Sequence, residues 1–185
     1  MFTVIDAAYP PVSLPPEASG VLGYIGGARA TNVWTLTQWE RFSHVRQFPG
    51  YVPDMTASPV TQAEDAVKLA LASGWAPWQR GNGERVIVFD LETGVNDIWW
   101  AQLATTVCIR GFVPVCYGSQ STVYGNHAGA YLTADWTGHI PVLPVGETEH
   151  GIQYEANVAW EGTRVDYSVF DQWLMDRGGV GARHT

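Results

Sequence analysis

The stretch Arg85-Val86-Ile87-Val88-Phe89-Asp90-Leu91-Glu92 contains the clearest strand pattern of the chain and its most distinctive polar pair. Residues 85–91 form a nearly continuous apolar run, which is typical of a strand that is covered on both faces, as in a parallel sheet. Asp90 and Glu92 end the run, and positions i and i+2 of a strand point to the same side. The stretch therefore predicts a buried parallel strand that delivers two carboxylates into one space.

Apolar runs alternate with helical patterns on both sides of this strand. Further strands are predicted at residues 2–5, 21–25, 51–52, 112–117, 130–136 and 151–154, with Asp166 in a last short extended piece. Helices are predicted at residues 36–45, 59–72, 96–110 and 167–177. In the helix at 59–72, Thr61 is the expected N-cap because Glu64 follows three residues later.

Strand–helix–strand alternation indicates parallel pairing, in either an open doubly wound sheet or a closed barrel. No Gly-rich phosphate loop follows the first strand, which disfavours the nucleotide-binding open sheets. A typical barrel of this class has roughly 250 residues, whereas this chain has 185. We therefore predict an α/β fold, a modified and shortened TIM-type (β/α) barrel with about eight strands and about five helices.

Length and charge limit the organisation and the partners. Residues 1–177 are predicted as a single domain and residues 178–185 as a flexible tail. The net charge of −8 repels a phosphate backbone, so nucleic acid is not expected as a partner. The sequence has neither a signal-peptide pattern at its start nor an apolar run long enough to cross a membrane. The five histidines lack metal-ligand spacing, and we predict neither a metal nor a cofactor.

Polar side chains recur where the predicted strands end, and Asp166 adds one more in the last extended piece. Those at the strand ends are Asp6, Asp54, Asp90 with Glu92, Tyr117, Asp135 with Trp136, and Gln153 with Tyr154. Because active sites of α/β barrels lie at the carboxyl ends of the strands, these residues predict a polar basin there. For Asp6, Asp54 and Asp135, the N-cap of the following helix is an equally good interpretation.

The pair Asp90 and Glu92 suits acid–base chemistry. Two neighbouring carboxyl groups raise the pKa of one partner, which leaves one acid and one carboxylate near neutral pH. Glycoside hydrolysis uses such a pair. The same pattern is equally compatible with a divalent metal in a phosphodiesterase, although the histidine ligands common in such sites are not evident.

The segment from Val86 to Glu92 resembles the fourth-strand D-x-E motif of family-25 glycoside hydrolases, the lysozyme-like muramidases. Other segments resemble further strands of that family in the same order: Val4-Ile5-Asp6, Pro114-Val115-Cys116-Tyr117-Gly118-Ser119, Leu132-Thr133-Ala134-Asp135-Trp136, Ile152-Gln153-Tyr154, and Val165-Asp166-Tyr167-Ser168-Val169-Phe170. Gly23-Tyr24-Ile25-Gly26-Gly27 is similar to the glycoside-hydrolase-like domains of actinobacterial secreted proteins and of phage lysins or tail proteins.

The resemblance implies cleavage of the glycan strands of bacterial peptidoglycan. It implies Glu92 as the proton donor, Asp90 and Asp6 as its carboxylate partners, and Asp166 as a fourth acid. Tyr117, Trp136 and Tyr154 are then expected to line the sugar groove, and Gln153, Asp135 and Asp54 are further candidate substrate contacts. The expected setting is extracellular, at the cell wall or in a phage virion, with other domains or virion proteins as partners.

One departure from the family keeps a second interpretation open. Ala7-Ala8-Tyr9-Pro10-Pro11 follows Asp6, where the muramidases carry Ser and Gln. The alternative is a catalytically silent glycan-binding or structural barrel module of a phage virion or cell surface. The presence of Glu92 favours the enzyme.

Overall fold

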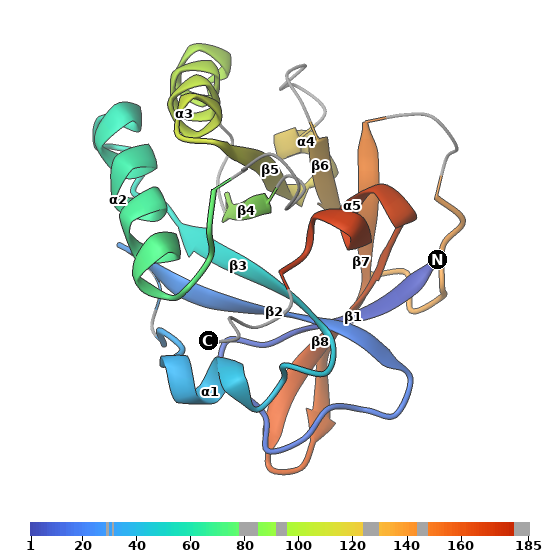
Figure 1. Cartoon of the computed structure of the whole chain (residues 1–185). Coiled ribbons are helices and arrows are strands. Elements are labelled where there is room, and N and C mark those ends of the chain that lie inside the picture. Colours follow the sequence, from blue (N-terminus) through green and yellow to red (C-terminus); the bar gives the residue numbers. More distant parts are fainter. Residues whose placement is uncertain are drawn as a thin grey trace.

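The computed structural model describes residues 1–28, 30, 32–77, 85–91, 96–123, 130–143 and 148–179, and the strands of these residues close into one barrel (Figure 1). Each strand pairs with the next along the chain, and the last pairs with the first. The strands are β1 (Phe2–Asp6), β2 (Ala18–Gly27), β3 (Arg46–Val52), β4 (Arg85–Asp90), β5 (Phe112–Ser119), β6 (Ala130–Ala134), β7 (Glu149–Trp160) and β8 (Thr163–Phe170). The predicted shortened (β/α) barrel is confirmed.

The barrel is mixed rather than fully parallel. β1 to β7 pair in parallel, whereas β8 is antiparallel to both of its neighbours. The cause is the connection between β7 and β8, because Glu161 and Gly162 form a two-residue turn with φ of 43° and 80°. Two left-handed residues are the signature of a tight hairpin, and a parallel strand would need a long crossover. This hairpin makes residues 167–170 a strand, so the helix predicted over residues 167–177 was wrong in its first part.

The described residues form five helices: α1 (Leu36–Glu40), α2 (Pro59–Ala72), α3 (Asp97–Ile109), α4 (Gln120–Val123) and α5 (Gln172–Arg177). α2 and α3 lie side by side on the outside of the barrel (Figure 1). The N-cap of α2 is Ser58, whose hydroxyl accepts from the backbone N–H of Thr61, so the prediction of Thr61 as the cap was wrong. Pro59 explains this start, because proline suits the first helical position. None of these helices is long and apolar enough to span a bilayer.

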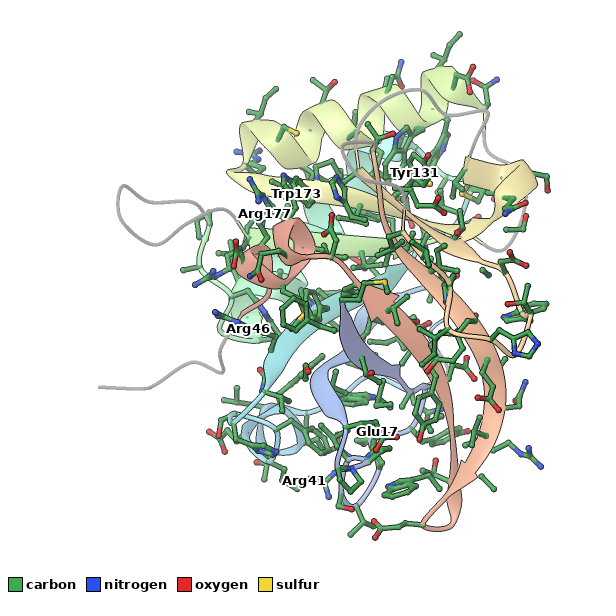
Figure 2. All side chains as sticks on the ribbon, turned by 90° about the vertical axis from the view of Figure 1, so that its right-hand side faces the viewer. Glu17, Arg41, Arg46, Tyr131, Trp173 and Arg177 are labelled. Carbon is green, nitrogen blue, oxygen red and sulfur yellow. The ribbon has the colours of Figure 1, made fainter. Side chains whose placement is uncertain are left out.

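The barrel interior follows the two-residue alternation of its strands. One buried cluster contains apolar side chains from seven strands, and only the inside of the barrel can bring these together. Its strand members are Val4, Leu22, Phe48, Val86, Val88, Val115, Tyr117, Ala130, Leu132 and Phe170. Leu174 and Met175 of α5 complete the cluster, so α5 closes the amino-terminal end of the barrel. Figure 2 shows Trp173 and Arg177 of α5 on the same side as Arg46, the first residue of β3.

The chain after α5 continues across this closed end. The backbone of Gly179 pairs with Gln47 of β3 through two hydrogen bonds of 2.7 and 2.8 Å. Gly178 packs close to the ring of Phe48. The first two residues of the predicted tail are therefore part of the fold.

Candidate active site

A polar layer lies directly above the apolar interior, at the carboxyl ends of the parallel strands. It follows from the same alternation, because Asp6 comes two residues after Val4 and Asp90 two residues after Val88. Asp6 is opposite Asp166 in the β1–β8 register, and Asp90 is opposite Tyr117 in the β4–β5 register. Register partners on neighbouring strands share a face and lie about 5 Å apart. The structure thus brings together Asp6, Asp90 and Asp166, which we call the acidic cluster, with Tyr117 beside them.

Asp6 is the most buried member of the acidic cluster, with 6% of its surface exposed. Burial raises its pKa well above the usual value, and the charges of Asp166 and Asp90 raise it further. A hydrogen bond from the backbone of Ala7 acts in the opposite direction but is the smallest contribution. Asp6 therefore keeps its proton to a higher pH than an exposed aspartate does.

Tyr24 is a member of this layer that the sequence analysis did not assign to the site. Its hydroxyl donates a hydrogen bond of 2.8 Å to Oδ2 of Asp90. Burial, followed by the charges of Asp6 and Asp90, raises the pKa of Tyr24 well above its usual value. Tyr24 therefore remains a neutral donor. The sequence did contain a signal for this role: Tyr24 follows the interior residue Leu22 by two positions, and residues two apart on a strand share a face.

Asp166 is held by two donors from β7. Nε2 of Gln153 donates to its Oδ2 at 2.9 Å, and the backbone N–H of Asn157 donates to its Oδ1 at 2.6 Å. Burial raises the pKa of Asp166, and these two hydrogen bonds oppose the rise. Asn157 has a φ of 59°, an uncommon conformation for a non-glycine residue, and β7 is irregular in register on both sides of Glu155. This bulged stretch of β7 supplies the Asn157 N–H that Asp166 accepts.

A chain of hydrogen bonds connects Asp166 with the protein surface. Nε1 of Trp136 donates to Oε1 of Gln153 at 2.7 Å, and Nε2 of the same amide donates to Asp166. Gln153 is 3% exposed and Trp136 is 69% exposed. An exposed indole next to a carboxylate layer suits stacking on a sugar ring, because flat apolar faces pack on the C–H faces of sugars.

Two of the predicted site residues, Tyr154 and Asp54, lie away from the polar layer. Tyr154 is on the opposite face of β7 from Gln153 and packs with Leu143, Ile152 and Val169 outside the barrel. Asp54 accepts from the backbone and the hydroxyl of Thr56, so its carboxylate forms a local turn.

Two further candidates complete the set. Asp135 is half-buried beside the layer, and its backbone N–H donates to the carbonyl of Gln153 at 2.9 Å. Glu92 lies outside the described residues, although the neighbouring Leu91 still donates to the carbonyl of Tyr117 at 2.8 Å. No group of three or more His, Cys, Asp or Glu in the described part of the chain has the arrangement of a metal site.

Together, the fold and the polar layer define the class of protein: an α/β barrel with a carboxylate site at the carboxyl ends of its parallel strands. No protein-family model and no curated protein matches the sequence. Solved structures do match. An uncharacterized protein of B. stearothermophilus is 16% identical, with a TM-score of 0.76 over 97% of this chain and 100% of the other.

The names of two further solved structures refer to a glycosyl hydrolase and to a peptidoglycan ligand. A family 25 glycosyl hydrolase from Bacillus anthracis is 12% identical, with a TM-score of 0.63 over 95% of this chain and 92% of the other. The modular autolysin LytC from Streptococcus pneumoniae, in complex with a synthetic peptidoglycan ligand, is 15% identical, with a TM-score of 0.63 over 92% of this chain and 46% of the other. The chain therefore has a family-25 glycoside hydrolase-like fold, as its motifs predicted.

Proposed function

We propose that this protein is a glycoside hydrolase that cleaves the glycan strands of peptidoglycan, with Glu92 as the general acid. The observation that carries the proposal is the convergence of Asp6, Asp90 and Asp166 with Tyr24 and Tyr117 at the end of the barrel where the parallel strands finish. Burying carboxyl groups together is costly for folding, and such costs are typical of catalytic sites. The family-25-like fold supports the same chemistry.

The roles follow from what glycoside hydrolysis requires. The leaving oxygen needs a proton, and the oxocarbenium-like transition state needs a negative charge beside the sugar ring. Glu92 follows Asp90 by two positions in the sequence, and this D-x-E pattern predicts two carboxyl groups on one side of a strand. We assign proton donation to Glu92 and charge stabilisation to Asp90, whose carboxylate Tyr24 orients. Asp6 supplies a further carboxyl group, and Asp166 is the fourth acid.

Three observations bear on the substrate and the setting. Trp136 offers an exposed ring beside the cluster, as a sugar platform requires. Asp135 lies next to it, and we assign it a substrate contact. The likeness to an autolysin solved with a peptidoglycan ligand supports glycan recognition. We place the protein's action at the cell wall, as a secreted or phage-borne protein that works alongside other domains or virion proteins.

The test is the release of reducing ends from purified peptidoglycan by the wild type, by Glu92→Gln and by Glu40→Gln. Glu40 is exposed on α1, so its variant controls for the lost charge. We expect release by the wild type, a fall of about a hundredfold or more in Glu92→Gln, and no change in Glu40→Gln. Equal release by the wild type and both variants would remove Glu92 from its role. If the wild type binds the glycan but releases nothing, the protein is the non-catalytic binding module.

A further inference from the structure

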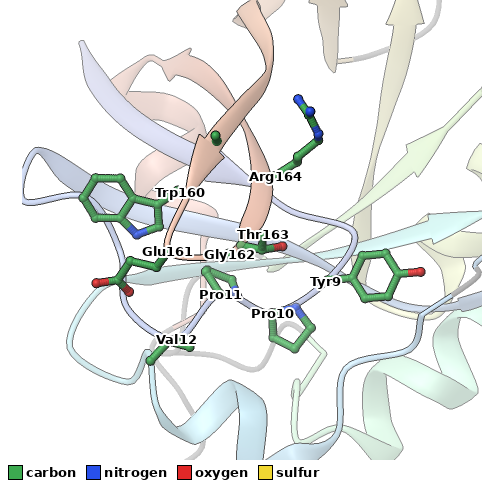
Figure 3. Close-up of a pocket in the computed structure, with 10 residues that line it drawn as sticks. Tyr9, Pro10, Pro11, Val12, Trp160, Glu161, Gly162, Thr163 and Arg164 are labelled. Atoms are coloured by element: carbon green, nitrogen blue, oxygen red, sulfur yellow. The ribbon is translucent and has the colours of Figure 1, made fainter.

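A groove lies between the loop that follows β1 and the tip of the β7–β8 hairpin (Figure 3). Its volume is about 850 Å³, and the described residues that line it include Tyr9, Pro10, Pro11, Thr163 and Arg164. In Figure 3, Tyr9 and Arg164 project to one side of the hairpin tip, and Trp160 projects to the other. None of these residues has a role in the acidic cluster.

The loop that forms one wall is fixed to the hairpin. The hydroxyl of Ser13 donates to Oε2 of Glu161 at 2.7 Å, and Nε1 of Trp160 donates to the carbonyl of Ser13 at 3.0 Å. Pro10 and Pro11 restrict the backbone between Tyr9 and this anchor. The groove is therefore largely formed before any ligand arrives, which lowers the entropic cost of binding.

The described lining of the groove contains one cation, Arg164, and one carboxylate, Glu161, which accepts from the Ser13 hydroxyl. The side chain of Arg164 is exposed, and Nη1 donates to the carbonyl of Asn157 at 2.7 Å. Among the described residues, no carboxylate lies within ion-pair distance of its guanidinium. The remaining N–H groups are thus available to an anion, and a planar guanidinium matches a carboxylate with two parallel hydrogen bonds.

The groove adjoins the acidic cluster. Arg164 and Asp166 are two residues apart on β8, so both point to the same face at a spacing of about 7 Å along the strand. The backbone of Asn157 joins them, because its N–H donates to Asp166 and its carbonyl accepts from Arg164. A ligand at the acidic cluster therefore has its next substituent within reach of Arg164.

We propose that this groove binds the acidic peptide substituent of a peptidoglycan strand, with Arg164 pairing with a peptide carboxylate and Tyr9 packing against the peptide. The inference rests on the proposed function and extends it from the glycan to the peptide that the glycan carries. Charge complementarity at Arg164 favours this occupant over an uncharged sugar, because a neutral glycan gives the guanidinium no anionic partner in addition to the Asn157 carbonyl.

Cleavage kinetics on two substrates test the proposal. One substrate is intact peptidoglycan strands, and the other is the same strands after removal of their peptides by an amidase. We expect Arg164→Gln and Tyr9→Ala to raise KM about tenfold on the peptide-bearing strands and to have little effect on KM for the stripped strands. Arg41→Gln, which changes an exposed arginine beside α1, is the matched control. An equal loss on both substrates, or no loss on either, overturns the proposal.

A binding measurement separates this inference from the proposed function. The disaccharide–tetrapeptide unit of peptidoglycan is titrated into the wild type, Arg164→Gln and Arg41→Gln by calorimetry. Binding that disappears only in Arg164→Gln supports the groove even if no variant cleaves glycan. A different result is that cleavage depends on Glu92 while the peptide unit binds the wild type and Arg164→Gln equally. In that case the proposed function stands, and the inference that the groove binds the peptide is wrong.

Discussion

The hydroxyl of Tyr24 donates to Oδ2 of Asp90 at 2.8 Å, across an intervening strand. Tyr24 is on β2 and Asp90 on β4, and β3 lies between them. The interior position of β3 at this level is Gly50, where an added Cβ would lie 3.2 Å from Cδ1 of Tyr24. The absence of a side chain at Gly50 therefore leaves the space through which Tyr24 reaches Asp90.

Replacing Tyr24 by Phe removes the hydrogen bond and keeps the ring. A hydrogen bond to a charged group contributes about 1.5–3 kcal/mol, so we expect kcat on peptidoglycan to fall by about tenfold or more. Tyr51→Phe is the matched control, because its hydroxyl donates to Asp65 at 2.9 Å outside the barrel. A Tyr51→Phe variant with as low a kcat as Tyr24→Phe would show that the loss comes from general destabilisation.

Gly50→Ala is expected to act through Tyr24. The added methyl would lie 3.1 Å from Cδ2 of Leu22 and 3.2 Å from Cδ1 of Tyr24. We expect the resulting shift of the Tyr24 ring to lengthen its hydrogen bond to Asp90 and to lower kcat. A double-mutant cycle with Tyr24→Phe checks this route. Once the hydroxyl is gone, Gly50→Ala should cost much less activity than it does in the wild type. Additive losses would mean that Gly50 acts independently of Tyr24.

The raised pKa of Asp6 predicts that the free energy of unfolding falls as the pH rises. An acid with a raised pKa in the folded state binds more protons when folded, between its ordinary pKa of about 4 and the raised value. The free energy of unfolding therefore decreases with pH through that window, by at most about 1.4 kcal/mol per pH unit for one proton. Asp6→Asn should flatten this decrease in urea unfolding curves. The exposed Asp176→Asn should retain the wild-type slope, and an unchanged slope in Asp6→Asn would contradict the assignment.

Gln153→Leu breaks the connection between Trp136 and Asp166. Asp166 then loses one of its two β7 donors, and the indole N–H loses its acceptor. We expect kcat to fall by about tenfold and KM to rise, because both Asp166 and the Trp136 indole lose a hydrogen bond that holds them. Gln47→Leu is the control, since Gln47 is an equally buried amide that donates to the carbonyl of Trp39 far from the cluster. Similar activity of the two variants would contradict a positioning role for Gln153.

Local sequence patterns correctly predicted a strand where its own residues determine its position and its burial. The run ending at Asp90 is apolar on both faces, so its strand and its direction could be read directly from the sequence. The antiparallel β8 could not, because its cause is a two-residue turn at Glu161 and Gly162, and the residues after it carry a helix-like pattern. A tight turn changes the direction of a strand without changing its hydrophobicity.

The site was predictable to a similar degree. Strand ends located Asp6, Asp90 and Tyr117, because parallel strands finish at one end of a barrel. Asp166 was expected in a last short extended piece, and it lies within the antiparallel β8. Tyr154 was grouped with Gln153 by sequence adjacency, yet neighbouring residues of a strand face opposite sides. Tyr24 was not assigned because its role depends on Gly50, a residue on another strand.

The pairing of β1 with β8 has a consequence for how the protein is made. Asp6 leaves the ribosome long before Asp166, yet the two residues face each other in one register. Contacts between distant parts of a chain form slowly, because a long loop must close first. The acidic cluster can therefore assemble only after synthesis of nearly the whole domain, so a nascent or truncated chain has no complete site.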